Sequence, residues 1–411
     1  MKTHIIKPVG RYCILLLSVF ILATVISSCN HDSDDPEPVV TTADHTIFMY
    51  MPWTASLKTY IDENVSNIKT AIVNNGGLGN DKFVIFTYSN STTAYLIEIK
   101  YENGKCVNDT LKKYSSPAIT TSSGLTSIFN DVKTETPGKS YSMIIGCHSI
   151  GWVSKTAWSN FEKGNTSAKQ FGSSQGGRKF YLTRSYGGDS NDYRAETSTL
   201  VDGIKGAGIK MQYILFDDCY MANMESAYQM RDVTNYLIGS TCEIMAYGMP
   251  YLTVWKYLVG TPDYNAVCTQ FYKFYSTYEA PYGTLAVINC NEAENMAAVM
   301  KNINSQCAKC DSTDDIQKLD GFTTTVYFDM GDYVKHLCNG NTSLYSSFET
   351  ELAKLVPYSV HTSEYYSIFY HTSTSGTNVI NSFSGVTISD PSTNSSIKSD
   401  IPNTEWYIAS H

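Results

Sequence analysis

The chain has 411 residues, of which 42% are hydrophobic, 17% charged and 13% aromatic. This composition suits a large folded core and excludes a disordered protein, and the length suggests two or three domains. The formal net charge is −9, and it becomes −12 when the three basic residues before Cys29 (Lys2, Lys7 and Arg11) are set aside. Such an acidic protein is a poor ligand for nucleic acid or an anionic membrane, and it suits a cationic substrate.

The N-terminus has the features of an export signal. Basic residues precede an apolar stretch at 14–26, and its 13 residues are too few to span a bilayer. The Ile-Ser-Ser-Cys sequence that ends at Cys29 resembles a bacterial lipobox, in which the cysteine is lipidated. We therefore predict a lipoprotein signal peptide at 1–28, lipidation of Cys29 and an acidic tether at 29–44. The protein is then expected at the outer membrane or cell surface, with the periplasmic face as the alternative.

The region up to residue 250 alternates between strand and helix patterns. Apolar and β-branched runs predict strands at 46–51, 83–88, 95–101, 107–114 and 236–240. Two further runs, which end before His148 and before Cys219, also predict strands. Helical spacing of apolar residues predicts helices at 60–73, 125–132 and 200–207, and after Cys219, where Met221, Met224 and Tyr228 share a face. The alternation predicts an α/β fold with a mostly parallel sheet flanked by helices.

Two regions depart from this alternation. The stretch 152–199 is polar, rich in Ser and Gly and without clear period, so it is expected to be a long functional or mobile loop. Beyond residue 250 the pattern is mixed, with helices predicted at 271–278, 293–304 and 344–355, and strands at 285–289, 324–328, 366–370 and 386–388. We divide the chain into a catalytic core at 45–260 and a C-terminal α/β extension at 261–411, packed on the core.

Cysteine usage and the absence of common motifs narrow the function. The chain has 11 cysteines at irregular spacing, which permits disulfides in an exported protein but indicates no disulfide framework. Cys307 and Cys310 form a single CxxC motif, for which a local disulfide or two thiols on a helix are better interpretations than zinc. The sequence has no P-loop, GxGxxG or HExxH motif, which excludes nucleotide-binding, Rossmann-type and zinc-protease functions.

Two apolar runs end at reactive side chains. The segment MIIGCHSIGW carries His148, and the segment YILFDDC ends at Cys219. Open α/β sheets place their active sites just past the carboxyl ends of buried parallel strands, and a Cys with a His there suffices for a thiol nucleophile. A core thiol and a half-buried loop histidine are the alternatives, but the two aspartates before Cys219 argue against an apolar environment.

The residues around Cys219 carry opposing electrostatic influences. The positive end of the helix after Cys219 is expected to lower the thiol pKa, whereas Asp217 and Asp218 are expected to raise it. One aspartate would then cap the helix and the other would face the cleft as a fixed anion. Backbone N–H groups at Cys219 and at Ser149, just after His148, are the expected donors to an oxyanion.

Four motifs in order resemble the clostripain family of cysteine peptidases. They are a Tyr-Met pair at Tyr50, HxxGW from His148, FDDCxMxxxE from Phe216 and SxxEIxxxGMPY from Ser240, and they span roughly 44–251. The family belongs to the caspase-like clan, so the resemblance implies a caspase-like sheet with additional C-terminal elements. Some members depend on calcium, which stays open here although no ligand cluster stands out; no other cofactor and no metal ligand is expected.

The resemblance also assigns roles. It implies Cys219 as nucleophile, His148 as acid and base, and cleavage after Arg or Lys. Asp217, two residues before the cysteine, matches the acidic group at the bottom of the family's S1 pocket, where a carboxylate pairs with a guanidinium or ammonium. Asp218 and Glu243 are then supporting groups, and they are the alternatives for the S1 role.

One departure and one further prediction concern the same region. The family usually has Gly directly after the histidine, where this chain has Ser149, which costs more if the backbone there needs a positive φ. Cys147 also places a second thiol near the site. Some family members mature by self-cleavage between the His and Cys blocks, and we predict one cut within 155–200 after a basic residue. The candidates are Lys155, Lys163, Lys169, Arg178, Lys179, Arg184 and Arg194.

The sequence thus predicts a lipid-anchored cysteine endopeptidase of the cell envelope. Its partners would be peptides or proteins with a basic P1 residue and, through Cys29, a membrane; nucleic acid is excluded. The first alternative is a catalytically inactive family relative that acts as an envelope binding lipoprotein. The second is another Cys-His hydrolase or transpeptidase acting on neutral amides, for which Asp217 would have no use in the pocket.

Overall fold

The computed structural model describes residues 41–411, apart from 165–182, 185–192, 309, 311 and 370–375. The predicted signal peptide, the lipidation site at Cys29 and most of the predicted tether lie outside these residues. Within the described part of the chain, no helix is both long and apolar enough to cross a membrane.

A nine-stranded sheet runs through the molecule in the order β10-β8-β7-β6-β5-β1-β2-β3-β4. Its strands are β1 (Ala43–Met51), β2 (Lys82–Asn90), β3 (Thr93–Glu102), β4 (Lys105–Ser115), β5 (Gly138–Ile145), β6 (Met211–Phe216), β7 (Thr234–Gly239), β8 (Thr284–Asn289) and β10 (Tyr358–His361). The five central strands, β7-β6-β5-β1-β2, are parallel, and the strands at both edges are antiparallel. This arrangement confirms the predicted α/β fold with a mostly parallel sheet.

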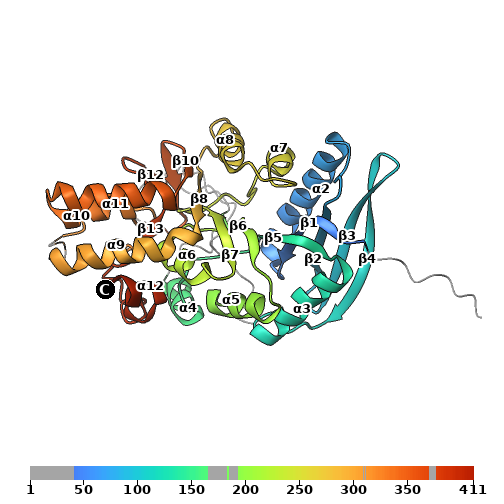
Figure 1. Cartoon of the computed structure of the whole chain (residues 1–411), viewed down its shortest axis with the longest axis horizontal. Coiled ribbons are helices and arrows are strands. Elements are labelled where there is room, and N and C mark those ends of the chain that lie inside the picture. The colour runs from blue at the N-terminus through green and yellow to red at the C-terminus, as the bar shows by residue number, and fades with distance from the viewer. Residues whose placement is uncertain (1–40, 165–182, 185–192, 309, 311, 370–375) are drawn as a thin grey trace, which may run out of the picture. The chain divides into compact units, whose positions relative to one another are not determined.

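Helices cover both faces of this sheet, which is why its central strands are apolar almost throughout. The α-helices of the described residues are α2 (Lys58–Asn74), α3 (Ser122–Glu135), α4 (Lys155–Gly164), α5 (Thr197–Gly206), α6 (Met224–Met230), α7 (Tyr251–Val254), α8 (Tyr264–Tyr275), α9 (Ala293–Gln306), α10 (Met330–Cys338), α11 (Thr342–Leu355) and α12 (Glu405–Ser410). In Figure 1, α2, α7 and α8 lie on one side of the sheet and α3 and α5 on the other.

The two faces have separate hydrophobic cores. Along β6, Ile214 and Phe216 belong to the core under α3 and α5, whereas Tyr213 and Leu215 belong to the core under α2, α7 and α8. This alternation follows from the two-residue period of a strand. The chain leads from the end of this strand to Cys219, so residues of the two cores surround the catalytic candidates.

Several predicted elements have other bounds in the structure. Helix α4 forms inside 152–199, where a loop was predicted, and its residues Ala157 and Trp158 are buried. Helix α8 ends at Tyr275 rather than continuing to residue 278. The strand predicted at 324–328 is wrong except for its end, because only Phe328–Asp329 pair as β9. Short apolar stretches carry too little period to fix such bounds.

The region after residue 261 contributes to the sheet and surrounds one end of it. Strands β8 and β10 extend the sheet beyond β7. Two small sheets pair β11 (Glu364–Tyr366) with β12 (Thr377–Val379), and β13 (Thr387–Ile388) with β9. Helix α10 and strand β10 were not predicted. The described part of the strand predicted at 366–370 forms strand only at Tyr366, the last residue of β11.

Candidate active site

The two catalytic candidates follow neighbouring parallel strands. Strands β5 and β6 pair with Ile145 opposite Phe216. His148 and Cys219 each lie three residues beyond those partners, so both emerge at the carboxyl edge of the sheet. This is the edge at which open α/β sheets place their sites.

Cys219 is fully buried. Its Sγ accepts a hydrogen bond from the N–H of Ile244 at 3.1 Å and lies 3.7 Å from the carbonyl oxygen of the same residue. Burial, and next the negative charge of Glu243, raise the pKa of the thiol well above its ordinary value. The expected lowering by a helix end is wrong, because α6 begins only at Met224 and Asn223 caps it.

His148 is also buried, and it forms a hydrogen bond between Nε2 and Oγ of Ser56 at 2.9 Å. Burial lowers the pKa of His148 to about 3. A contact with the backbone of Arg184 works against that change, while the positive charges of Arg184 and Arg194 add to it. The imidazole is therefore neutral near pH 7, which is the protonation state that a general base needs.

Ser149 directs its backbone N–H at the carbonyl oxygen of Arg184, at 3.1 Å. Ser149 is not among the described non-glycine residues with positive φ, so the departure from the family's Gly brings no backbone strain here. The strained position is instead Tyr220, directly after Cys219, with φ of 60°. Strain next to a reactive group is a recurrent property of functional sites.

A buried ion pair lies beside the two catalytic candidates. Nη1 of Arg184 is 3.2 Å from Oδ2 of Asp217, and both side chains are 0% exposed. Asp217 also accepts hydrogen bonds from the N–H of Met249 at 2.9 Å and the hydroxyl of Tyr251 at 3.0 Å. Burial raises the pKa of Asp217, and the charge of Arg184 opposes that rise. Asp217 therefore lies at the bottom of an enclosed site that holds an arginine.

The remaining donors of the Arg184 guanidinium are satisfied by oxygens around it. They are Oδ1 of Asn64 (2.7 Å) and the carbonyl oxygens of Asp217 (3.0 Å), Ala246 (3.3 Å) and Tyr247 (3.3 Å). Gly248 closes this site with φ of +75°, and a Cβ there would come within 2.3 Å of Arg184 Nη2. The sequence motif around Ser240 contains Gly248 and Tyr251 but did not reveal their roles. Nothing in the sequence marked Asn64 or Ser56.

The backbone around Arg184 is held like an added strand. Its N–H donates to the carbonyl oxygen of Ile244 at 3.0 Å, and Thr183 pairs with Met245 as an antiparallel bridge. Peptides that bind by β-augmentation are held by such main-chain hydrogen bonds, with alternate side chains filling pockets. Ile244 thus contacts both the backbone of Arg184 and the thiol of Cys219.

Asp218 has a different environment from its neighbour. Its Oδ1 accepts a hydrogen bond from the N–H of Cys147 at 2.5 Å, and the Cys147 Sγ lies 3.6 Å from Oδ2. Burial raises the pKa of Asp218 to about 8, and burial likewise raises that of the Cys147 thiol well above its usual range. The prediction that one aspartate caps the helix is wrong, since Asn223 does so. Asp218 instead fixes the loop that carries His148.

Glu243 is also buried, and its negative charge acts on the thiol of Cys219. One carboxylate oxygen, Oε1, accepts hydrogen bonds from the Tyr220 hydroxyl at 2.9 Å, the Ile368 N–H at 3.1 Å and the Ser367 hydroxyl. The second oxygen, Oε2, accepts from Thr183 Oγ1 at 2.6 Å. Glu243 therefore lies next to the Arg184 segment rather than at its guanidinium.

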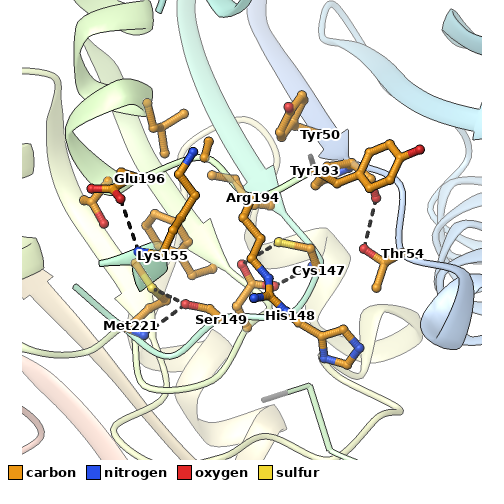
Figure 2. A pocket seen from close by; sticks show the side chains of 18 of the residues that line it. Tyr50, Thr54, Cys147, His148, Ser149, Lys155, Tyr193, Arg194, Glu196 and Met221 are labelled. Atoms are coloured by element: carbon orange, nitrogen blue, oxygen red, sulfur yellow. Dashed lines mark hydrogen bonds between the residues drawn. The ribbon is translucent and has the colours of Figure 1, made fainter. Parts of the chain in front are cut away.

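A cavity of about 100 Å³ lies on the side of Asp218 and borders His148. Figure 2 shows Tyr50, Thr54 and Tyr193 on one side of it and Lys155, Glu196 and Met221 on the other, with Cys147, His148 and Arg194 between. The guanidinium of Arg194 stacks over the ring of Trp158, 4.1 Å from its centre. Asp217 and Cys219 are not among the lining residues.

The described residues offer no evident metal site. Among them, no three His, Cys, Asp or Glu side chains are grouped so as to hold a metal ion. None of the nine cysteines in the described ranges is joined in a disulfide, Cys307 and Cys310 of the CxxC motif included.

Comparison with known proteins agrees with this arrangement. The model of the clostripain family matches residues 49–401. A secreted C11 cysteine protease from Bacteroides thetaiotaomicron, iotapain, is 43% identical, covers 90% of this chain and 100% of its own, and superposes with a TM-score of 0.80.

Two further structures are informative. A clostripain from Bacteroides thetaiotaomicron in complex with the peptide inhibitor BTN-VLTK-AOMK is 47% identical, covers 55% of this chain and 99% of its own, and has a TM-score of 0.52. An inactive zymogen C11 protease from Parabacteroides distasonis is 25% identical, covers 90% of this chain and 99% of its own, and has a TM-score of 0.73. Among curated proteins there is no match.

Proposed function

The chain belongs to the clostripain family and is a cysteine peptidase, and from this premise we propose that it cleaves peptide bonds after arginine or lysine. Cys219 is the nucleophile, His148 the acid and base, and Asp217 the carboxylate that binds the P1 side chain. One observation supports this assignment, namely that Arg184 of the chain itself pairs with the buried Asp217, as a basic P1 residue would.

Three contacts of Arg184 support that role. Its guanidinium pairs with Asp217, its carbonyl oxygen accepts from the N–H of Ser149, and its N–H donates to Ile244. A P1 residue needs the same three features: a charge partner, a donor to the carbonyl that becomes an oxyanion, and a backbone anchor. A buried aspartate without a cationic partner would be costly, so the site favours basic side chains.

In the proposed reaction, neutral His148 accepts the thiol proton while the Cys219 sulfur attacks the P1 carbonyl carbon, because the raised thiol pKa and the lowered pKa of His148 disfavour a free thiolate beforehand. A C–S bond forms, and the oxyanion is held by the N–H groups of Ser149 and Cys219. Collapse breaks the C–N bond as His148 gives its proton to the leaving amine. Water, deprotonated by His148, then hydrolyses the thioester, which releases the carboxylate product and restores the thiol.

With Arg184 in place, the site is closed to other substrates, so we propose that this form is a precursor that cuts itself after Arg184. This names one bond within the range 155–200 predicted from the sequence. The sequence Leu182-Thr183-Arg184 matches the Leu-Thr-Lys end of the inhibitor peptide bound by the Bacteroides thetaiotaomicron clostripain, with one basic residue exchanged for the other. The Parabacteroides distasonis relative is itself described as an inactive zymogen.

Fluorogenic peptides that differ only at P1 test the specificity. Arg and Lys peptides should be cleaved, Ala and Asp peptides should not, and the Cys219→Ala variant should cleave none. Turnover of the Ala peptide at the rate of the Arg peptide would contradict a basic S1 pocket and favour an amide hydrolase of another specificity. No turnover and no labelling of Cys219 by a thiol-reactive basic peptide would indicate an inactive binding protein.

Intact mass tests the self-cleavage. The wild type should yield two chains with a junction after Arg184, and Cys219→Ala should stay a single chain. Arg184→Ala should lack this cut, whereas the matched control Arg178→Ala should keep it. Single chains of unchanged mass in both the wild type and Cys219→Ala would rule the proposal out.

We further propose that the protein is exported and anchored by lipid at Cys29, as its N-terminal sequence predicts. The relative from Bacteroides thetaiotaomicron is described as secreted. In cells, the wild type should fractionate with membranes and carry a diacylglyceryl mass on its N-terminal peptide, and Cys29→Ala should lose both. Unmodified Cys29 in the wild type would contradict the anchor. If the anchor is present, proteolysis at the surface of intact cells would distinguish an outward from a periplasmic location.

A further inference from the structure

Thr183, the residue before Arg184, lies in a second buried site with a polar contact. Thr183 is fully buried, and its Oγ1 donates a hydrogen bond of 2.6 Å to Oε2 of Glu243. Its backbone pairs with Met245 in the antiparallel bridge that aligns Arg184 with Asp217. If Arg184 occupies P1, Thr183 occupies P2, and Glu243 is the polar group of the P2 site.

Hydrogen bonds from residues before and after it in the sequence hold the Glu243 side chain in a single orientation. Its Oε1 accepts hydrogen bonds from three groups: the Tyr220 hydroxyl at 2.9 Å, the Ile368 N–H at 3.1 Å and the Ser367 hydroxyl. Because Oε1 is committed to these groups, the carboxylate cannot rotate without leaving buried donors unsatisfied. Oε2 therefore faces the P2 residue in a fixed direction, where it accepts the hydrogen bond from the Thr183 hydroxyl.

We infer that Glu243 forms an S2 subsite that selects a residue with a short hydroxyl side chain, threonine or serine, before the basic P1 residue. This inference rests on the proposed function and names a specificity that lies beyond S1. A hydroxyl donates to Oε2, as Thr183 does. Valine has nearly the shape of threonine but no donor, so it would bury an acceptor against a methyl group. An aspartate at P2 would add repulsion between two carboxylates.

The position of Glu243 also connects P2 recognition to the reacting bond. Glu243 directly precedes Ile244, which contacts both the Arg184 backbone and the Cys219 Sγ. Tyr220, which donates to Glu243, directly follows Cys219. A hydrogen bond from P2 to Glu243 thus fixes the register in which P1 reaches Asp217 and its carbonyl reaches Ser149.

The site also gives the C-terminal region a part in specificity. Ser367 and Ile368 lie just after β11, far along the chain from the catalytic candidates, yet both donate to Glu243. They act as positioning residues, because they hold the Glu243 carboxylate through their hydrogen bonds to Oε1.

Peptides with Arg at P1 and Thr, Ser, Val, Ala or Asp at P2 test the inference on the self-cleaved wild-type enzyme. We expect kcat/KM for the Thr peptide to exceed that for the Val peptide by about 10-fold or more, with Ser close to Thr and Asp the poorest. Equal values for Thr and Val, with Arg still required at P1, would overturn the S2 assignment alone. No cleavage of any of the peptides would overturn the proposed function and this inference with it.

The Glu243→Gln variant sharpens the result through ratios measured within one enzyme. The Thr-to-Val ratio and the Thr-to-Asp ratio should both fall, because an amide replaces the carboxylate. The matched control is Glu351→Gln, at a buried glutamate of α11 that pairs with Lys354, and it should keep both ratios. Unchanged ratios in Glu243→Gln would contradict the inference.

Should Glu243→Gln fail to fold, the full-length chain provides a second measurement. Thr183→Ser should self-cleave at close to the wild-type rate, and Thr183→Val should be slower by about 10-fold or more. Both substitutions leave Glu243 and the catalytic groups intact. Equal rates for the two variants would overturn the inference without reference to any peptide.

Discussion

Asp217 and Asp218 are adjacent in sequence but lie in two different regions of the molecule. Asp217 faces the core under α2, α7 and α8 and pairs with Arg184. Asp218 borders the cavity on the opposite side and accepts from the N–H of Cys147. Successive residues of an extended chain point to opposite sides, so one region holds a cation and the other a carboxyl group with a pKa of about 8. Neighbours, and not residue type, decide the chemistry of each.

The same division separates two thiols and gives the largest expected effect. Cys219 lies on the side of Arg184, and Cys147 lies beside Asp218. Cys219→Ala should abolish peptide cleavage, because it removes the proposed nucleophile, whereas Cys147→Ala should retain most of it. Initial rates on an Arg peptide, with circular dichroism to check folding, compare the two. Comparable losses in the two variants would show that both regions take part in the chemistry.

The second largest effect is expected from a comparison of Asp217 with Asp218. Asp217→Asn should lower kcat/KM for Arg substrates by a factor equivalent to about 2–4 kcal/mol, because it removes the buried charge partner proposed for the P1 side chain. Asp218→Asn should have a smaller effect, with no change in the Arg-to-Ala preference. Steady-state kinetics on P1 Arg and Ala peptides measure both. An unchanged preference in Asp217→Asn would move the S1 role to another group.

The pH dependence of stability should separate Asp218 from the rest of the fold. The folded state keeps the Asp218 proton up to a pKa of about 8, whereas the unfolded chain releases it near 3.8. Between these values the folded state binds more protons, so stability falls as pH rises, by roughly 1.4 kcal/mol per pH unit between pH 5 and 7. Asn at this position does not titrate. The wild type should therefore lose stability relative to Asp218→Asn over this range.

Urea unfolding of the two proteins at pH 5, 6 and 7 measures that difference. Cys219→Ala serves as the background for both, since it prevents self-cleavage during the experiment. Other buried carboxyl groups with raised pKa values, such as Glu225 and Asp320, contribute equally to both proteins and cancel. A difference that stays constant with pH would mean that Asp218 is ionised in the folded state.

The smallest expected effect concerns the wall of the Arg184 site. Gly248→Ala places a Cβ 2.3 Å from Arg184 Nη2 and 2.5 Å from Asp217 Oδ1, at a backbone φ of +75°. We expect kcat/KM for Arg substrates to fall by a factor equivalent to about 1–3 kcal/mol, because the backbone is strained and the pocket is narrower. The control is Gly260→Ala, at a similarly positive φ but with open space around it. Equal losses in the two variants would show that strain alone is responsible.

Much of the fold follows from local pattern. The apolar runs that end at Ile145 and Phe216 are buried on both faces, and this alone indicates parallel strands under helices. Helix α4 was missed because its residues lie in a polar stretch and become buried only through tertiary packing of Trp158. Likewise, the sequence could not show that α6 starts as late as Met224, since the turn before it depends on contacts with distant residues such as Ser240.

The sequence by itself determined that a cysteine and a histidine each follow an apolar strand, because hydrophobic periodicity is local and survives without coordinates. It also supplied the adjacent aspartates and the family motifs. Only the tertiary structure decided that Arg184 pairs with Asp217 across 33 residues, and that the cavity belongs to Asp218. It also decided between the opposing influences expected at Cys219, because burial raises the pKa of the thiol. The physical reason is that charge pairing and desolvation depend on neighbours in space, and these come from segments far apart in the chain.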